Sequence, residues 1–366
     1  MKIAIIHDWL VELGGAEKVL ESIINVFPDA DVFSLVCSLS KKQLKMLGIN
    51  KQVRTSFIQK LPMGMKNYRI YLPFMPMAIQ QLDLSEYDLI ISSSYCVAKG
   101  VLTGPDQLHI CYCHSPVRYA WDLQGQYLKE NGMDKGIKSF LARLVLNKIR
   151  DFDVRSSFAV DKYIANSTFI QRRILKFYRR ESKIIFPPVD TSSFLLCEDK
   201  DDYYITCSRL VPYKKIDLIV NAFRNMPEKT LLVIGQGPEY NHLTELLPDN
   251  VKLLGYVEYE ALITYIQRAK AFVYAAQEDF GIVPVEAQAC GTPVIGFGKG
   301  GLLDTVIDGV TGVYFTQQTI ESIVEAVSRF ESSKGMASAA EISWHARQFG
   351  SERFEAELSA YIELLV

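Results

Sequence analysis

The sequence has no long apolar run and no recognisable export signal. No stretch of about eighteen consecutive apolar residues occurs in the 366-residue chain, so no transmembrane helix is expected. Met1 leads directly into the strand-like segment KIAIIHDWL, without the basic start, apolar middle and cleavage site of a signal peptide. We therefore expect a cytoplasmic protein.

The seven cysteines are scattered and include no CxxC pair. Their spacing fits neither a disulfide framework nor a zinc site. Cys111 and Cys113 alternate along a predicted strand, and we expect both to be buried structural residues.

The net charge of −2 hides an asymmetry between the two halves of the chain. Residues 1–187 carry 26 Lys and Arg against 17 Asp and Glu, and the remainder carries 14 against 25. A basic first half suits an anionic surface or a phosphorylated acceptor, but a block of charge is as often a solvated face. Both interpretations stay open at this point.

Short β-rich runs alternate with helical stretches, and the series occurs twice. The first series is KIAIIH, DVFSLV, YDLIISSS, LHICYC, KYIANS and SKIIFPP; the second is YYITCSR, TLLVIG, VKLLG, KAFVYAA and TPVIGF. Two consecutive βαβ arrays predict an α/β fold with two doubly wound parallel sheets. Because Pro187-Pro188 continues neither a strand nor a helix, we expect domains at residues 1–187 and 188–350.

Glycines precede a helix in the first array. Gly14-Gly15 opens an amphipathic stretch, AEKVLESIINVF, whose apolar residues recur at helical spacing. Glycines at a helix start let backbone N–H groups approach an anion, and the helix dipole favours negative charge. Many βα turns use glycine simply to turn, so phosphate binding is one of two interpretations.

Two cations flank a turn after the first strand of the second array. Arg209 and Lys214 in TCSRLVPYKKIDLIVNAF lie where open α/β sheets bind ligands. The planar fork of arginine and the mobile charge of lysine together suit two bridged phosphates. The alternative is a pair of solvated loop charges.

Two glutamates surround a predicted helix start in EDFGIVPVEAQACGTPVIGFGKGG. Pro284 suits the first turn of a helix, which places Glu286 in that turn and Glu278 in the preceding loop. This layout suits a ligand lying across the helix start with one carboxylate at each end; the alternative is a helix-dipole residue and a surface charge. The amides that would point at a phosphate there are those of Phe280, Gly281 and Ile282.

These three elements together resemble the retaining GT-B glycosyltransferases of family four. The glutamate pair with FG inside it, SRLVPYKK upstream and GGAE near the N-terminus occur in the family's order and spacing. Further segments, HDWLVELGGAEKVL, AKGV, CYCHSPVRYAWD, DVRSSFAVDKYIANS and IIFPPVD, resemble bacterial mannosyltransferases that build O-antigen, capsule or exopolysaccharide units. The resemblance implies two Rossmann-like domains facing across a cleft, with a helix at 351–366 packed back on the first.

The resemblance implies roles for the glutamates and the first glycines. Glu286 would hold the ribose hydroxyls of the nucleotide, an acceptor-only carboxylate facing two donors. Glu278 would orient hydroxyls of the transferred sugar. Gly14 and Gly15 would let the N-terminal domain close onto the diphosphate.

The same resemblance assigns the cations and one histidine. Arg209 and Lys214 would bind the donor diphosphate and stabilise its growing charge. Many relatives have glycine where this chain has Lys215, so which lysine reaches the phosphates stays open. His114 in CYCHSPVRY matches a histidine beside the sugar and is expected to form hydrogen bonds as a neutral imidazole, whereas His109 is expected to be packed.

The implied activity is retaining transfer of a hexose, mannose from GDP-mannose, to a lipid-diphosphate-linked or glycan acceptor. A same-face displacement is favoured, and no metal or cofactor is expected. A UDP-sugar donor, a non-catalytic nucleotide-sugar binding subunit and a nicotinamide oxidoreductase suggested by GFGKGG remain alternatives; no nucleic acid partner is expected.

A membrane contact is a further hypothesis. Residues 172–180, RRILKFYRR, hold five basic side chains, and KSFLARLVLNKIR mixes apolar and basic residues at helical spacing. Such faces could bind anionic lipid headgroups on the inner side of the cytoplasmic membrane. A solvated helix that packs by its apolar side is the alternative.

Overall fold

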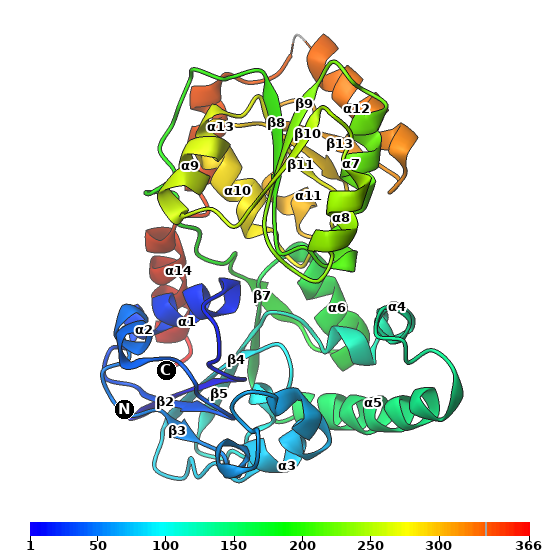
Figure 1. The fold of residues 1–366 in the computed structure, drawn as a ribbon. Coiled ribbons are helices and arrows are strands. Elements are labelled where there is room, and N and C mark those ends of the chain that lie inside the picture. The colour runs from blue at the N-terminus through cyan, green and yellow to red at the C-terminus, as the bar shows by residue number, and fades with distance from the viewer. Residues whose placement is uncertain (334) are drawn as a thin grey trace. The chain divides into compact units, whose positions relative to one another are not determined.

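The computed structural model describes residues 1–333 and 335–366, and it divides into two compact units (Figure 1). Unit 1 comprises Met1–Pro188 with Phe354–Val366, and unit 2 comprises Val189–Arg353. Each unit has its own parallel sheet and hydrophobic cores. The two units are therefore described separately.

Unit 1 is built on a seven-stranded sheet in the order β3-β2-β1-β4-β5-β6-β7, in which all pairings are parallel. Its strands are β1 Ile3–His7, β2 Asp31–Ser34, β3 Arg54–Thr55, β4 Leu89–Ser94, β5 Leu108–Cys113, β6 Lys162–Ala165 and β7 Ser182–Ile184. Its helices are α1 Gly15–Val26, α2 Lys41–Met46, α3 Met75–Gln80, α4 Gln124–Glu130, α5 Gly136–Ser157, α6 Thr168–Tyr178 and most of α14 Ser351–Glu363.

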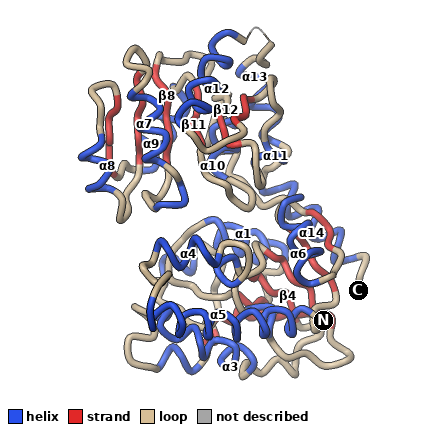
Figure 2. The backbone as a smooth tube through the Cα atoms, turned by 90° about the vertical axis from the view of Figure 1, so that its right-hand side faces the viewer, coloured by secondary structure: helices blue, strands red, loops and turns tan. Residues whose placement is uncertain are grey.

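Both faces of this sheet are covered because successive side chains of a strand point to opposite sides. Ile5 belongs to a core with residues of α1 and α14, whereas Ala4 and Ile6 belong to a core with α3 and Phe152 of α5. Figure 2 shows α1 on one side of β4 and α3 and α5 on the other. The strand sequences are consequently nearly continuous apolar runs.

Unit 2 repeats the pattern with a six-stranded parallel sheet in the order β10-β9-β8-β11-β12-β13. Its strands are β8 Tyr203–Cys207, β9 Thr230–Ile234, β10 Val251–Gly255, β11 Ala271–Tyr274, β12 Val294–Phe297 and β13 Gly312–Phe315. Its helices are α7 Ile216–Arg224, α8 Tyr240–Leu246, α9 Tyr259–Arg268, α10 Ile282–Ala289, α11 Leu302–Thr305, α12 Ile320–Ser332 and α13 Ala339–Arg347.

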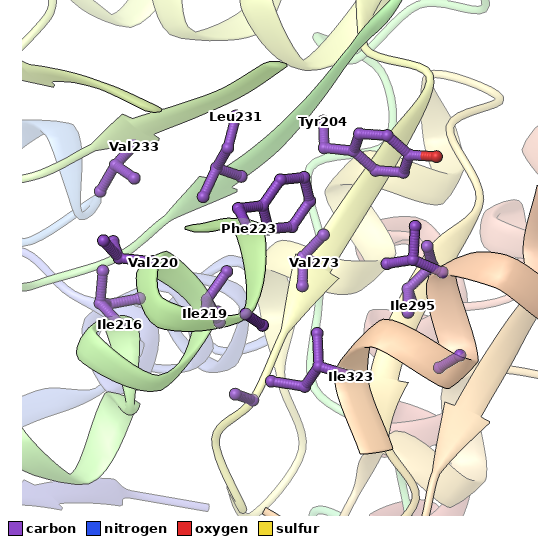
Figure 3. Packing of buried hydrophobic residues seen from close by; sticks show 14 of the residues in the cluster. Tyr204, Ile216, Ile219, Val220, Phe223, Leu231, Val233, Val273, Ile295 and Ile323 are labelled. Atoms are coloured by element: carbon purple, nitrogen blue, oxygen red, sulfur yellow. The ribbon is translucent and has the colours of Figure 1, made fainter. Parts of the chain in front are cut away.

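One core of unit 2 lies between its sheet and the helices α7 and α12. Figure 3 shows Ile219 and Phe223 of α7 and Ile323 of α12 packed against Val273 and Ile295 of the sheet. The spacing of the α7 residues is the amphipathic pattern that the sequence displays. In Figure 1, α7, α8 and α12 lie on one side of this sheet and α9, α10 and α13 on the other.

Every predicted strand is present, and two further strands were missed. β3 has two residues and β13, with the sequence GVYF, has four, so both are short edge strands with little apolar periodicity. Cys111 and Cys113 are buried, as predicted, and all seven cysteines are free.

A buried ion pair fixes the position of α5 in unit 1. Lys99 Nζ pairs with Asp153, which also accepts hydrogen bonds from Trp121 Nε1 (2.7 Å) and the Tyr178 hydroxyl (2.9 Å). Burial disfavours the charge of Lys99, but the Asp153 carboxylate outweighs this effect and raises the pKa of Lys99. One carboxylate thus connects α5, α6 and the segments at residues 99 and 121.

None of the helices in the described part of the chain is both long enough and apolar enough to cross a bilayer.

Candidate active site

The order of the strands in each sheet defines where a ligand can bind. In unit 1 the direction of strand progression reverses between β1 and β4, and in unit 2 it reverses between β8 and β11. Loops that leave the carboxyl ends of such neighbouring strands diverge and form the usual binding crevice of an open α/β sheet. The segments after His7, Ser94, Cys207 and Tyr274 are therefore the ones to inspect.

At the switch point of unit 1, one buried carboxylate organises the chain that leaves β4. Asp8 accepts four backbone hydrogen bonds, from the N–H groups of Tyr95 (2.7 Å), Cys96 (2.9 Å), Val97 (2.6 Å) and Ala98 (2.8 Å). Burial raises the pKa of Asp8, while these hydrogen bonds oppose the shift. Because all four donors are backbone groups, Asp8 fixes the path of residues 95–98.

Beside this anchor, three strand ends contribute to a line of polar side chains that ends at His114. His114 Nε2 lies 2.8 Å from Ser93 Oγ, and Ser93 Oγ lies 3.0 Å from His7 Nδ1. His7 Nε2 lies 3.3 Å from Oε1 of Glu17, a residue of α1. His7 and Ser93 have no exposed surface, whereas His114 is partly exposed.

The predicted glycine turn opens α1 beside this line. Gly14 is the N-cap of α1, and its N–H donates to Glu17 Oε2 at 2.9 Å. A Cβ on Gly14 would lie 3.1 Å from that oxygen, so a larger residue would crowd the contact. Gly14 and Gly15 therefore lie at the start of α1, and Glu17 connects Gly14 to His7. Phosphate binding by the two glycines stays a prediction.

The two histidines of β5 and its exit are held in the neutral form. Burial lowers the pKa of His114 to about 3, and the neighbouring His7 adds to the shift. Burial also lowers the pKa of His109 to about 4. His109 is buried and bonded to Ser92, which confirms that it is a packed residue.

At the switch point of unit 2, a lysine and a carboxylate meet. Lys214 Nζ forms an ion pair with Glu278, and the Tyr274 hydroxyl donates to the other oxygen of the same carboxylate. The side chains of Lys214 and Glu278 are 13% and 21% exposed, so an incoming ligand can reach both. Lys215 instead adopts a left-handed conformation (φ 57°) as the N-cap of α7.

Arg209 is exposed on the loop that follows β8. Two glycines hold this loop against the exit of β9: a Cβ on Gly235 would lie 1.9 Å from the Ser208 carbonyl oxygen, and one on Gly237 would lie 2.2 Å from that of Leu210. The approach is possible because neither glycine carries a side chain. The path of the loop that carries Arg209 is thus set by backbone packing.

Glu286 lies just past the first turn of its helix, and not within that turn as was predicted. α10 begins at Ile282, after Gly281 in a left-handed conformation (φ 89°), so Pro284 is in the first turn and Glu286 is the fifth helical residue. The Glu286 residue is only 7% exposed. A carboxylate buried to this extent is not a surface charge of the helix dipole, and its role at the ribose stays a prediction.

The glycine cluster GFGKGG does not lie at the first βα turn of a dinucleotide fold. It follows β12, where a Cβ on Gly300 would lie 2.3 Å from the Glu278 carbonyl oxygen. The Gly301 N–H donates to that same oxygen at 2.9 Å. The glycines therefore allow this loop to support the backbone at Glu278 and Phe280, where a Cβ on Gly301 would lie 2.2 Å from the Cα atom.

In residues 1–333 and 335–366, no group of three or more His, Cys, Asp or Glu side chains is arranged to hold a metal ion. The chain has three Asp-x-Asp triplets, at residues 29–31, 151–153 and 199–201, and Asp201 of the third pairs with Arg268. Asp31 bonds to basic side chains near the surface, and Asp153 belongs to the buried ion pair. The expectation that no metal is required stays a prediction.

Of the five basic side chains in segment 172–180, Arg172, Lys176 and Arg179 are exposed, whereas Arg173 and Arg180 have structural partners. Arg173 is buried, pairs with Asp122 and donates to the Pro116 carbonyl at 3.3 Å. Arg180 donates to the Val160 carbonyl at 2.7 Å. Arg173 and Arg180 thus have partners within unit 1, and a membrane contact of the segment stays a prediction.

Five residues of these two clusters were not assigned roles from the sequence. They are His7, Asp8, Glu17, Ser93 and Tyr274. Asp8, Ser93 and Tyr274 are polar side chains at or directly after the carboxyl end of a strand, and that position is the signal that could have identified them.

Two family models match adjoining parts of the chain. The model for Glycosyltransferase Family 4 matches residues 13–193, and the model for Glycosyl transferases group 1 matches residues 192–349. Between them they cover both units and every candidate site residue except His7 and Asp8.

Curated relatives include two mannosyltransferases. The chain is 26% identical, over an alignment of 375 residues, to an alpha-1,3/1,6-mannosyltransferase of Kluyveromyces lactis, covering 84% of this chain and 71% of that protein. It is 36% identical over 137 residues to a GDP-mannose-dependent monoacylated alpha-(1-6)-phosphatidylinositol monomannoside mannosyltransferase of Corynebacterium glutamicum, covering 33% of this chain and 36% of that protein.

Solved structures confirm the two Rossmann-like domains of the GT-B fold. Anabaena HepE in complex with UDP has a TM-score of 0.73 at 19% identity, covering 99% of this chain and 100% of that one. Sucrose-phosphate synthase of Thermosynechococcus elongatus has a TM-score of 0.74 at 17% identity, covering 100% and 99%. At these identities the likeness concerns the fold alone.

The lowered pKa of His114 predicts a loss of stability in acid. Between pH 6.5 and the folded-state pKa the unfolded chain binds more protons than the folded one, so stability falls as the pH falls. His114→Gln removes this site and keeps a side chain that can bond Ser93. From pH 6.5 to 5, wild-type protein should lose about 2 kcal/mol more unfolding free energy than the variant in urea titrations.

The exposed His242 supplies the matched control, because its side chain is surrounded by solvent in the folded protein. His242→Gln should follow the wild-type curve. Parallel curves for wild-type protein and His114→Gln would contradict the assignment of a neutral His114.

Proposed function

Because the chain belongs to the group 1 and family 4 glycosyltransferases, we propose that it transfers mannose from GDP-mannose, with retention, to a lipid-diphosphate-linked or glycan acceptor. The proposed setting is bacterial surface polysaccharide assembly. The names of the mannosyltransferase relatives support this choice of sugar. The acceptor is inferred from the sequence motifs alone.

The observation that carries the proposal is the cluster of Lys214, Glu278 and Tyr274 at the switch point of unit 2. Lys214 supplies a mobile positive charge for a diphosphate, and the exposed Arg209 supplies a planar fork. Once Lys214 engages a phosphate, the Glu278 carboxylate is released to accept hydrogen bonds from sugar hydroxyls. In the absence of donor, the side chains of Lys214 and Glu278 are thus held by their ion pair.

The start of α10 supplies the remaining donor contacts in this proposal. The amides of Phe280, Gly281 and Ile282 lie at the helix N-terminus, where N–H groups lack helical partners. Glu286, buried in the same helix, accepts the two ribose hydroxyls. Gly300 packs closely against the backbone of Glu278, in the loop that precedes α10.

The proposed chemistry is a same-face displacement. The bond between the anomeric carbon and the phosphate oxygen breaks, and the acceptor oxygen bonds to the same face of the anomeric carbon. The acceptor proton passes to the departing phosphate oxygen. Arg209 and Lys214 stabilise the charge that develops on the diphosphate, which is the main catalytic contribution of fixed charges.

A UDP-sugar donor is the second candidate within the same reaction class. HepE, which shares the fold, has been solved with UDP-glucose. The phosphate and ribose contacts proposed here would serve either nucleotide. A non-catalytic subunit that binds the donor without transferring it is the alternative from another class.

Thermal stabilisation by nucleotides should distinguish these candidates. A ligand that binds the folded protein raises its melting temperature, so GDP and GDP-mannose should give the largest shifts among GDP, UDP, ADP and NAD. A shift with UDP alone would keep the reaction class and exclude mannose from GDP-mannose. A shift with NAD alone would contradict the proposal, and donor binding without transfer to any acceptor or water would favour the non-catalytic subunit.

The ribose assignment predicts a loss of donor affinity in Glu286→Ala. Removal of a carboxylate that accepts two hydroxyl hydrogen bonds should weaken GDP binding by about 1.5–3 kcal/mol, measured by titration calorimetry. Glu325→Ala, an exposed glutamate on α12, should bind GDP as wild-type protein does. Equal affinity in Glu286→Ala and wild-type protein, with both folded, would remove the assignment.

The first half of α5 carries a surface suited to an anionic membrane. Four apolar side chains at helical spacing are exposed, namely Ile137 (79%), Phe140 (63%), Leu141 (55%) and Leu144 (48%). The exposed basic residues around them are Lys135, Lys138, Arg143 and Lys148. We propose that this stripe inserts at the headgroup boundary of the membrane that holds a lipid-linked acceptor.

Vesicle co-sedimentation tests this contact. Wild-type protein should bind phosphatidylglycerol vesicles at low salt, and the double variant Ile137→Ser/Phe140→Ser should bind roughly tenfold or more weakly. Trp344→Ser, which removes an equally exposed aromatic residue of α13, serves as the control and should bind normally. Absence of wild-type binding, or equal binding by the double variant, would exclude the α5 surface.

A further inference from the structure

A line of four side chains connects the start of α1 to the partly exposed His114. Glu17, His7, Ser93 and His114 are joined by contacts of 3.3, 3.0 and 2.8 Å. We infer that this relay selects the tautomer of His114 and leaves its Nδ1 as a hydrogen-bond acceptor for a substrate hydroxyl. Glu17, His7 and Ser93 are positioning residues in this assignment.

The assignment follows from the donor and acceptor capacity of each group. The assignment gives His7 one ring proton; because a carboxylate can only accept, this proton lies on Nε2 toward Glu17, and Nδ1 is left to accept from Ser93. Ser93 therefore donates its single proton to His7. Its oxygen then accepts from His114, which must carry its proton on Nε2.

The other ring nitrogen of His114 is left with a lone pair. In the described part of the chain, no protein group is hydrogen-bonded to His114 Nδ1, and the residue keeps some exposed surface. The rings of Tyr95 and Tyr112 contact the imidazole edge-on, at centroid distances of 5.8 and 5.2 Å. The orientation of the acceptor is consequently fixed by packing as well as by Ser93.

Glu17 also connects this relay to the glycine turn. Its Oε2 accepts from the Gly14 N–H, while its Oε1 faces His7. The conformation at the start of α1 and the protonation pattern at His114 therefore depend on one carboxylate. The role of the acceptor nitrogen rests on the proposed transferase function, with a sugar or acceptor hydroxyl as donor.

The tautomer can be read directly from ¹⁵N chemical shifts of the imidazole nitrogens. The chain has five histidines, so ¹⁵N-histidine labelling gives a simple long-range ¹H–¹⁵N spectrum, in which His114→Gln assigns the signals of His114. At pH 8, wild-type His114 should show a protonated Nε2 and an unprotonated Nδ1. An Nδ1–H form of His114 in wild-type protein would overturn the inference.

Two substitutions test whether the relay sets this state. In Glu17→Gln the amide N–H₂ can donate to His7 Nε2, which reverses each donor in the line and should populate the Nδ1–H form of His114. In Ser93→Ala the contact to His114 is lost, and both tautomers should appear; Ser93→Thr restores the hydroxyl and should restore the wild-type pattern. An unchanged His114 spectrum in both Glu17→Gln and Ser93→Ala would also overturn the inference.

Ser92→Ala is the matched control. Ser92 is equally buried in the same strand and bonds His109 instead of His114, at 2.9 Å. This variant should alter the His109 signals and leave those of His114 unchanged. A change at His114 in Ser92→Ala as large as that in Ser93→Ala would show a general disturbance of the sheet and would contradict a specific relay.

The ¹⁵N spectra are recorded without substrate, so they test the tautomer of His114 independently of the proposed function. With donor and acceptor present, Glu17→Gln and Ser93→Ala should lower kcat/KM by roughly tenfold or more, because a mis-set histidine tautomer is costly in catalysis. The expected tautomer together with no transfer by wild-type protein would retain the relay and reject the transferase proposal. Unreduced kcat/KM in a variant with altered tautomer would reject the role of Nδ1.

Discussion

Parallel pairing of the strands is the constraint on which both candidate sites depend. In a parallel sheet all carboxyl ends lie at one edge, and a reversal of strand order separates the two loops that leave its central strands. β1 and β4 form this reversal in unit 1, and β8 and β11 form it in unit 2. Residues far apart in the sequence, such as Lys214 and Glu278, meet there because the register of their strands brings them together.

The two sites use their polar groups differently. In unit 1, Asp8 is wholly buried and satisfied by four backbone N–H groups, so it holds a loop in place and has no capacity for a ligand. In unit 2, Lys214 and Glu278 satisfy each other through a partly exposed ion pair, which a charged ligand can replace at small cost. The Asp8 cluster therefore holds a loop in a fixed conformation, whereas the Lys214–Glu278 pair can exchange its partners for a ligand.

The sequence was sufficient to predict every strand except the short edge strands β3 and β13, and the amphipathic helices α1 and α7, because these follow from local periodicity. It was not sufficient for contacts between distant segments. Nothing local indicates that Ser93 lies between His7 and His114, or that the glycines after β12 support Glu278. Nothing local indicates either that Arg173 is buried, since its partner Asp122 is distant in the chain.

Burial of the histidine suits the charge changes of the proposed transfer. As the glycosidic bond breaks, positive charge develops on the sugar and negative charge on the diphosphate. A cationic imidazole near the sugar would oppose this separation, whereas a neutral one can accept a hydroxyl hydrogen bond without repulsion. In the proposed mechanism the His114 imidazole thus stays uncharged, and Arg209 and Lys214 supply the positive charge that the diphosphate requires.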